Sequence, residues 1–103
     1  MKNDDLEITQ NKENGVLRFI LKGRVSVINA PTLQFKLEEV LKHGEKNIVL
    51  NMMQVTFLSS AGIRIILKIH KKTFEMKGSL GIEEPSEVVK NVLGMTALEE
   101  LLV

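Results

Sequence analysis

Two adjacent hydroxyl groups, those of Ser59 and Ser60, are the side chains that most readily suggest chemistry in this sequence. A serine nucleophile needs a base, yet no Gly-x-Ser-x-Gly turn surrounds the pair and no histidine lies close in sequence. His43 and His70 lack the His-x-x-x-His spacing of a metal site, and a Walker-type phosphate loop is absent. We therefore expect a protein that is not an enzyme and that needs no cofactor or metal.

The serine pair precedes a long apolar-periodic segment and so falls at the start of a predicted helix. This helix is expected to begin at Ser59-Ser60-Ala61-Gly62 and to run to about Lys77-Gly78. At this position the Ser60 hydroxyl would serve as the N-cap that accepts a backbone N–H bond. A phosphate on the same hydroxyl would also be stabilised, because free N–H groups and the helix dipole favour negative charge there. Both roles are open from the residues alone.

The same helix has a wide apolar sector. At 100° per residue, one stripe holds Ile63, Ile66, Leu67, His70 and Phe74, and the opposite arc holds Arg64, Lys68, Lys71, Lys72 and Glu75. Ile65 and Ile69 lie between the two. They are either core residues at the edge of a sheet or, with Arg64 and Lys68, an exposed apolar patch flanked by cations, which is typical of protein-binding sites. His70 is expected to be a satisfied core histidine, and His43 a solvated residue at a helix end.

The rest of the chain predicts the elements that position this helix. Asn14-Gly15 is a two-residue hairpin turn, and the apolar runs 16–22 and 48–52 favour interior strands, with 52–58 as a loop. A helix is expected from Asn29-Ala30-Pro31 to His43-Gly44, a last strand at 79–82, a third helix beginning within 83–87 and a short fourth helix after 94–96. This order favours an α/β fold, a four-stranded mixed sheet with helices packed chiefly on one face.

Bulk properties narrow the class further. A chain of 103 residues has room for one domain, expected to span residues 1–103. Lys and Arg number 14 against 13 Asp and Glu, so a net charge of +1 offers no field to attract nucleic acid. Cysteine is absent, so the chain has no disulfides and is compatible with a reducing cytoplasm. The first ten residues are charged and do not resemble a signal peptide. We expect a cytoplasmic protein with no membrane span and no direct nucleic-acid contact.

Two segments carry a resemblance to a known family. The stretch Ile48-Val49-Leu50-Asn51-Met52, continued by Val55-Thr56-Phe57-Leu58-Ser59-Ser60-Ala61-Gly62-Ile63-Arg64, resembles the signature of STAS domains, specifically the bacterial anti-sigma factor antagonists. Leu21-Lys22-Gly23-Arg24-Val25-Ser26 with Asn29-Ala30-Pro31-Thr32-Leu33 resembles a second block of that family. The similarity spans nearly the whole chain, and the predicted order of elements fits the family fold. A single STAS-like domain is therefore expected.

The resemblance implies roles for individual residues. In the family an Asp precedes the serine that accepts phosphate, so Ser59 takes the Asp position and Ser60 that of the acceptor. Ser26, Asn51 and Ser59 all stand where family members commonly have Asp. The predicted partner-binding residues are Ser26, Ser59, Ser60, Arg64, Ile65, Lys68 and Ile69.

The resemblance also implies a function. The unphosphorylated protein would bind an anti-sigma factor with serine kinase activity and so free a sigma factor. Phosphorylation at Ser60 would end the binding, and a phosphatase would restore it. The alternative is a STAS subunit that is never phosphorylated and acts as a structural or ligand-sensing component of a larger assembly such as a lipid transporter; the three missing acidic residues favour it. A hydrolase using Ser60 would instead form a covalent adduct with a serine-directed probe.

Overall fold

The computed structural model describes residues 6–103, apart from the side chain of Ala97. The elements are, in chain order, β1 (Leu6–Glu13), β2 (Val16–Val25), α1 (Ala30–Lys42), β3 (Asn47–Leu58), α2 (Ser60–Glu75), β4 (Ser79–Glu83), α3 (Glu87–Leu93) and the 3-10 helix η1 (Ala97–Leu101). This order confirms the predicted alternation of strands and helices.

The four strands form one mixed sheet in the order β1-β2-β3-β4. β1 and β2 pair antiparallel through a turn in which Asn14 and Gly15 have φ of 53° and 82°, the left-handed values that a two-residue hairpin turn requires. β2, β3 and β4 run parallel. The prediction that the runs 16–22 and 48–52 are interior strands is confirmed, because β2 and β3 each have a neighbour on both sides.

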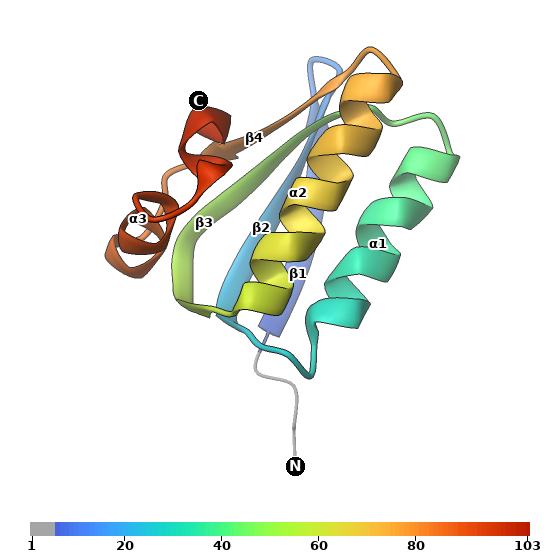
Figure 1. Ribbon diagram of the computed structural model, residues 1–103. Helices are drawn as coiled ribbons and strands as arrows, with labels where there is room; N and C mark the ends of the chain where they lie inside the picture. The colour runs from blue at the N-terminus through green and yellow to red at the C-terminus, as the bar shows by residue number, and fades with distance from the viewer. Residues whose placement is uncertain (1–5) are drawn as a thin grey trace.

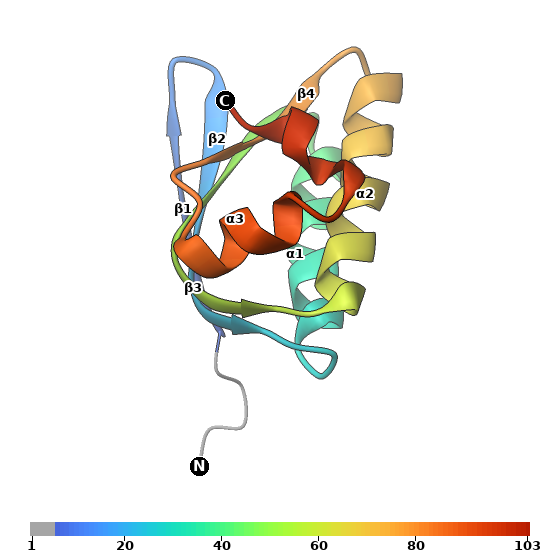
Figure 2. The same ribbon diagram turned by 60° about the vertical axis from the view of Figure 1, so that its left-hand side comes forward.

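Helices α1 and α2 cover one face of the sheet, and α3 and η1 lie beside β3 and β4 (Figures 1 and 2). Alternate residues of the central strands point toward α1 and α2 and are buried: Leu17, Phe19 and Leu21 of β2, and Ile48, Leu50 and Met52 of β3. From α1 the matching residues are Leu33, Leu37 and Leu41. The core thus lies between the sheet and the helices α1 and α2, and α3 and η1 extend it with Val89, Leu93, Leu98 and Leu101.

β3 is longer than the sequence predicted, because residues 52–58 are strand and not loop. They pair with the last residues of β2, including Gly23 with Val55 and Val25 with Leu58. The register between the two strands shifts twice along this stretch. Such irregularities break the two-residue alternation by which a strand is recognised in sequence, which explains the wrong prediction.

The other edge of this part of β3 is covered by the start of α3. β4 pairs with β3 only from Asn47 to Asn51. Beyond that point the Ser86 backbone N–H donates to the Met52 carbonyl (3.1 Å), and the Ser86 hydroxyl donates to the Val55 carbonyl (2.7 Å). The same hydroxyl also caps α3 by accepting a bond from the Val89 N–H at 3.2 Å.

Candidate functional site

The carboxyl ends of β2 and β3 meet at one edge of the sheet, where α1 and α2 both begin (Figure 1). The end of β2 is joined directly to the start of α2, since the Ser59 N–H donates to the carbonyl of Val25, the last residue of β2, at 2.9 Å. Parallel strands followed by helices bring helix N-termini and loops together at such an edge, which is where sites form in α/β proteins. The predicted residues Ser26, Ser59, Ser60 and Arg64 all lie here.

The start of α2 differs from the prediction in one respect: Ser59, and not Ser60, is the N-cap. The Ser59 hydroxyl accepts a hydrogen bond from the Gly62 N–H at 3.1 Å, and Ser59 is buried. Gly62 is needed at this close approach, because a Cβ there would lie 2.6 Å from Val25 Cγ1 and 2.9 Å from Leu58 Cδ1. The cap lies one residue earlier because Ser59 has extended backbone (φ −78°, ψ 165°), as an N-cap requires.

Ser60 is the first residue of α2 and is exposed to solvent. Its hydroxyl is therefore not used for capping and lies at the positive end of a 16-residue helix. A phosphate on this oxygen would meet free N–H groups of the first turn and would need no rearrangement of the core. The geometry thus distinguishes the two serines: Ser59 caps the helix, and Ser60 is exposed to solvent.

Ser26 and Asn29 form a tight reciprocal turn between β2 and α1. The Ser26 N–H donates to Asn29 Oδ1 (2.9 Å), the Asn29 N–H donates to Ser26 Oγ (3.2 Å), and Asn29 Nδ2 donates to the Arg24 carbonyl (2.8 Å). Asn29 therefore holds this turn together, and although it lies at the predicted start of α1, its side chain does not cap the helix. At the tip of the turn Val27 and Ile28 are 65% and 76% exposed. Sequence reasoning missed this apolar tip, although two aliphatic residues between a strand and a helix start were a signal.

A groove of about 240 Å³ lies between the first halves of α1 and α2. Val27 lines one side of it, and Arg64, Ile65 and Lys68 of α2 line the other. Lys68 Nζ also lies 4.0 Å from a carboxylate oxygen of Glu38, which accepts a shorter bond of 2.9 Å from Lys72. Arg64, Ile65 and Lys68 thus line the same groove as Ala61, the residue that follows Ser60 in the sequence.

The predicted apolar patch on α2 is corrected by the structure. Ile65 and Ile69 are buried, at 7% and 0% exposed, so they are core residues and Ile69 offers no surface to a partner. The buried face of α2 consists of Gly62, Ile65, Ile66, Ile69 and Thr73. Leu67 and Phe74, expected in the core stripe, are 38% and 75% exposed. A wide apolar sector leaves the rotation of a helix ambiguous, and here close contact at Gly62 fixes it.

His70 also differs from the prediction of a satisfied core histidine. The residue is half-buried, and its Nδ1 is buried without a hydrogen-bond partner among residues 6–103. His43 lies where expected, exposed at the end of α1, with Nδ1 2.9 Å from the Glu39 carbonyl.

Sequence reasoning also missed a cation–π pair at the same edge. Arg24 and Phe57 are partners in the β2–β3 ladder, and the Arg24 guanidinium carbon lies 4.5 Å from the centre of the Phe57 ring. Phe57 is 39% exposed. The pair therefore adds a partly exposed aromatic ring at the carboxyl ends of β2 and β3.

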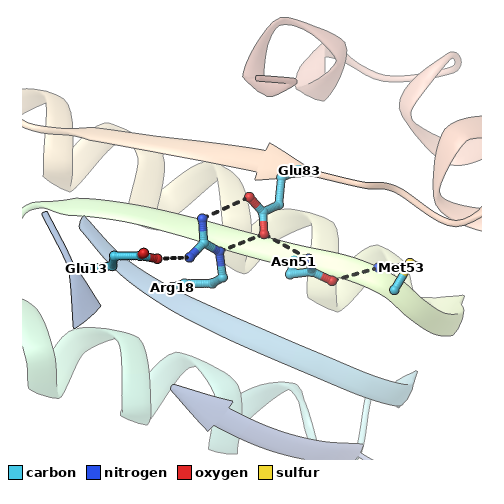
Figure 3. Close-up of polar contacts among 5 residues, drawn as sticks. All are labelled: Glu13, Arg18, Asn51, Met53 and Glu83. Carbon is cyan, nitrogen blue, oxygen red and sulfur yellow. Dashed lines mark hydrogen bonds and ion pairs between the residues drawn. The ribbon is translucent and has the colours of Figure 1, made fainter. Parts of the chain in front are cut away.

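Asn51, unlike Ser26 and Ser59, lies away from this edge. It projects from the middle of β3 on the sheet face opposite the helices and belongs to a polar network (Figure 3). Arg18 Nε and Nη2 donate to the two carboxylate oxygens of Glu83 (2.7 and 3.2 Å), and Asn51 Nδ2 donates to the same carboxylate at 2.8 Å. These bonds, that of Arg18 first, lower the pKa of Glu83 below its usual value. Asn51 therefore has a structural role and does not bear on the surroundings of Ser60.

Two further findings concern what the described chain lacks. In residues 6–103 no three His, Cys, Asp or Glu side chains gather in a way that could hold a metal ion. None of the helices in that range is both long enough and apolar enough to cross a membrane. This edge carries the exposed Ser60, the cations Arg24, Arg64 and Lys68, and the exposed apolar side chains of Val27 and Ile28.

The mixed four-stranded sheet in the order β1-β2-β3-β4, with α1 and α2 on one face, defines a small α/β domain. The STAS domain pattern matches residues 6–102, and the chain belongs to the STAS domain family.

Similar proteins agree with this assignment. A candidate anti-sigma factor antagonist of Bordetella bronchiseptica, BtrV, is 31% identical over 87 residues, which are 84% of this chain and 75% of that protein. The anti-sigma-B factor antagonist of Bacillus subtilis is 23% identical, over 97% of this chain and 89% of its own. The structure of the Bacillus protein SpoIIAA in its unphosphorylated form matches with a TM-score of 0.84 at 16% identity, covering 94% of this chain and 86% of that one. Its phosphorylated form matches with a TM-score of 0.77 at 15% identity, covering 94% and 89%.

Proposed function

We propose that this protein is an anti-sigma factor antagonist whose binding is switched by phosphorylation at Ser60. In its unphosphorylated form it binds an anti-sigma factor that has serine kinase activity, and a sigma factor is thereby freed. The observation that carries this proposal is the exposed Ser60 hydroxyl at the first residue of α2, beside the groove and the Val27–Ile28 tip. The names of the similar proteins support the same role.

The role is regulatory and not enzymatic, and the kinase partner would supply ATP and Mg²⁺. The protein itself contributes the position of one hydroxyl and a binding surface. A phosphatase would restore the unphosphorylated form. We place this exchange in the cytoplasm, where sigma factors act.

Phosphorylation adds about −1.5 to −2 charges at neutral pH. At the start of α2 the free N–H groups and the helix dipole favour that charge, so the domain stays folded. A partner docked over the same edge would have to desolvate the phosphate, and an unpaired buried charge costs several kcal/mol, with each ~1.4 kcal/mol equal to a tenfold change in affinity. Binding therefore falls by orders of magnitude while stability does not.

The absence of Asp at positions 26, 51 and 59 is weaker support for the never-phosphorylated alternative once the positions of these residues in the fold are known. Ser59 supplies the same N-cap acceptor that an Asp would supply, and Asn51 lies on the other face of the sheet. Of the three positions where family members commonly have Asp, only Ser26 and Ser59 thus lie near Ser60, and their replacement by serine leaves that region with less negative charge. The cation Arg64 is still present there. The alternative is a STAS subunit that is never phosphorylated, and phosphosite mapping distinguishes it from the proposal.

The test uses Ser60→Ala as bait in extracts of the native host to isolate the anti-sigma factor, followed by incubation of the purified pair with ATP. Phosphosite mapping should find Ser60 modified in the wild type and in Ser59→Ala, and no modification in Ser60→Ala. The affinity of the Ser60 phosphoprotein should be lower by at least a hundredfold. Modification of Ser59 instead, or full binding by the phosphoprotein, would contradict the proposal, and a stable unphosphorylated complex with a transporter would favour the alternative.

A further inference from the structure

We infer that the groove between α1 and α2 receives one apolar side chain of the anti-sigma factor, and that a carboxylate next to that side chain in the partner pairs with Arg64 and Lys68. This inference rests on the proposed function, because it takes the anti-sigma factor as the occupant. It names the chemistry by which the partner is recognised. The partner segment is thus an acidic one with an exposed leucine or phenylalanine.

The interior of the groove is apolar. Ala30 of α1 and Ala61 and Ile65 of α2 line it, and Ala30 and Ile65 are buried at 1% and 7% exposed. Small residues on both helices leave the space open, and Val27 extends the apolar surface to the neighbouring tip. An apolar side chain placed here would be removed from water on several sides, which is the situation of a binding hot spot.

The charged side chains on the rim of the groove are all positive. The eight described residues that line the groove include the cations Arg64 and Lys68 and no carboxylate. Glu38, the nearby acid, already accepts a 2.9 Å bond from Lys72, and Lys68 Nζ is 4.0 Å from the same oxygen. The charge of Lys68 is therefore only partly balanced. A partner group that faces this rim is complementary if it is negative.

The size of the groove argues for a side chain as its occupant. Its volume of about 240 Å³ is below the roughly 300–1,000 Å³ of sites that hold drug-sized ligands or cofactors. It exceeds the ~150 Å³ of an engineered cavity that binds benzene. One leucine or phenylalanine side chain fits this range, and a nucleotide does not.

The groove is continuous with the switch. Ser60 is adjacent to Ala61, and Ser60 and Arg64 are four residues apart, so their side chains are neighbours on the surface of α2. A phosphate on Ser60 would place negative charge beside the cation that the partner carboxylate uses. The same contact thus favours an acidic partner before phosphorylation and repels it afterwards.

The test measures the affinity of the purified anti-sigma factor for two pairs of variants by calorimetry. Ala61→Leu fills the groove with a good helix former, and Lys71→Leu places the same side chain on the exposed side of α2, outside the groove. Arg64→Glu reverses charge on the rim, and Lys71→Glu reverses it elsewhere on the helix. Thermal melting and amide NMR spectra establish that each variant is folded.

Ala61→Leu should weaken binding roughly tenfold or more, because the partner side chain can no longer be buried. Lys71→Leu should stay within about twofold of the wild type. Arg64→Glu should weaken binding more than Lys71→Glu and should reduce its dependence on salt. If Ala61→Leu does not fold, the Arg64→Glu pair decides.

Wild-type affinity in folded Ala61→Leu, or equal losses in Arg64→Glu and Lys71→Glu, would overturn the inference and leave the proposed function intact. If the wild-type chain binds no anti-sigma factor, the proposed function and the inference both fail.

Discussion

The exchange of roles between Ser59 and Ser60 leads to a sharp prediction about stability. Ser59→Ala removes the oxygen that accepts the Gly62 N–H at 3.1 Å, and Gly62 is buried, so water does not replace the bond. Loss of a serine N-cap costs about 0.5–2 kcal/mol, and a buried donor without an acceptor costs about 1–3 kcal/mol. Because both ranges describe the same bond, we expect the free energy of unfolding to fall by about 1.5 kcal/mol.

In a domain of this size that loss corresponds to a decrease of roughly 6–12 °C in Tm. Ser60→Ala is the matched control. Its side chain is exposed and alanine is the better helix former, so its free energy of unfolding should stay within about 0.5 kcal/mol of the wild type. Ser59→Asp should retain most of the stability, since a carboxylate accepts the same bond and favours the helix N-terminus.

The measurement is urea unfolding followed by circular dichroism, with the slope m compared between variants so that stability is separated from changes in the unfolded state. If Ser60→Ala lowers stability as much as Ser59→Ala, the hydroxyl of Ser60 is the cap and the reasoning is refuted. If neither variant changes stability, the bond to Gly62 contributes nothing measurable.

Three further predictions concern other parts of the fold. Arg18 lowers the folded-state pKa of Glu83, so the Glu83 carboxylate stabilises the fold above about pH 4.5, and this contribution is lost as pH falls through the folded-state pKa. The free energy of unfolding of Glu83→Gln, measured by urea unfolding, should therefore differ from that of the wild type most at neutral pH. A difference that grows as the pH is lowered would contradict this sign. Gly78→Ala should lower the free energy of unfolding by about 1–3 kcal/mol, since its Cβ would collide with the Lys46 backbone carbonyl. Gly94→Ala should be neutral or slightly stabilising in the same urea unfolding assay, since its Cβ would lie 3.6 Å from the Lys90 and Asn91 carbonyl oxygens, an ordinary van der Waals contact. Phe57→Ala should cost at most about 1 kcal/mol of stability for the lost contact with Arg24 yet reduce affinity for the anti-sigma factor in calorimetry; unchanged affinity would remove Phe57 from the binding surface.

Most of the architecture could be predicted from the sequence because its signals are local. Asn14-Gly15 specifies a hairpin turn, and the continuous apolar runs of β2 and β3 identify interior strands. The second half of β3 could not be predicted in this way. Its register with β2 shifts twice, so its buried residues Val55 and Leu58 are three apart and match neither strand nor helix periodicity clearly.

The site was predictable in its location and less so in its details. The position of Ser60 at the start of α2 followed from the sequence, yet the cap depends on the backbone angles of Ser59, which one residue type does not fix. The sequence left open whether Ile65 and Ile69 are core or exposed, and Ile69 was wrongly predicted to be a partner-binding residue. The rotation of α2 that decides this is set by tertiary contact at Gly62 with Val25 and Leu58, a contact between distant parts of the chain. Long-range contacts of this kind leave no pattern in a single helix.

The bonds that Ser86 makes to β3 also matter for aggregation. Residues 52–58, with the sequence Met-Met-Gln-Val-Thr-Phe-Leu, form an uncharged seven-residue segment rich in strand-forming residues and free of Pro and Gly, which is the composition of segments that stack into amyloid-like sheets. In the folded protein the edge of this segment is occupied by Ser86, so a second chain cannot add a strand at the Met52 and Val55 carbonyls. The covering residue lies about thirty positions later in the sequence, so the segment is unprotected while the C-terminal third is still being synthesised or is locally unfolded.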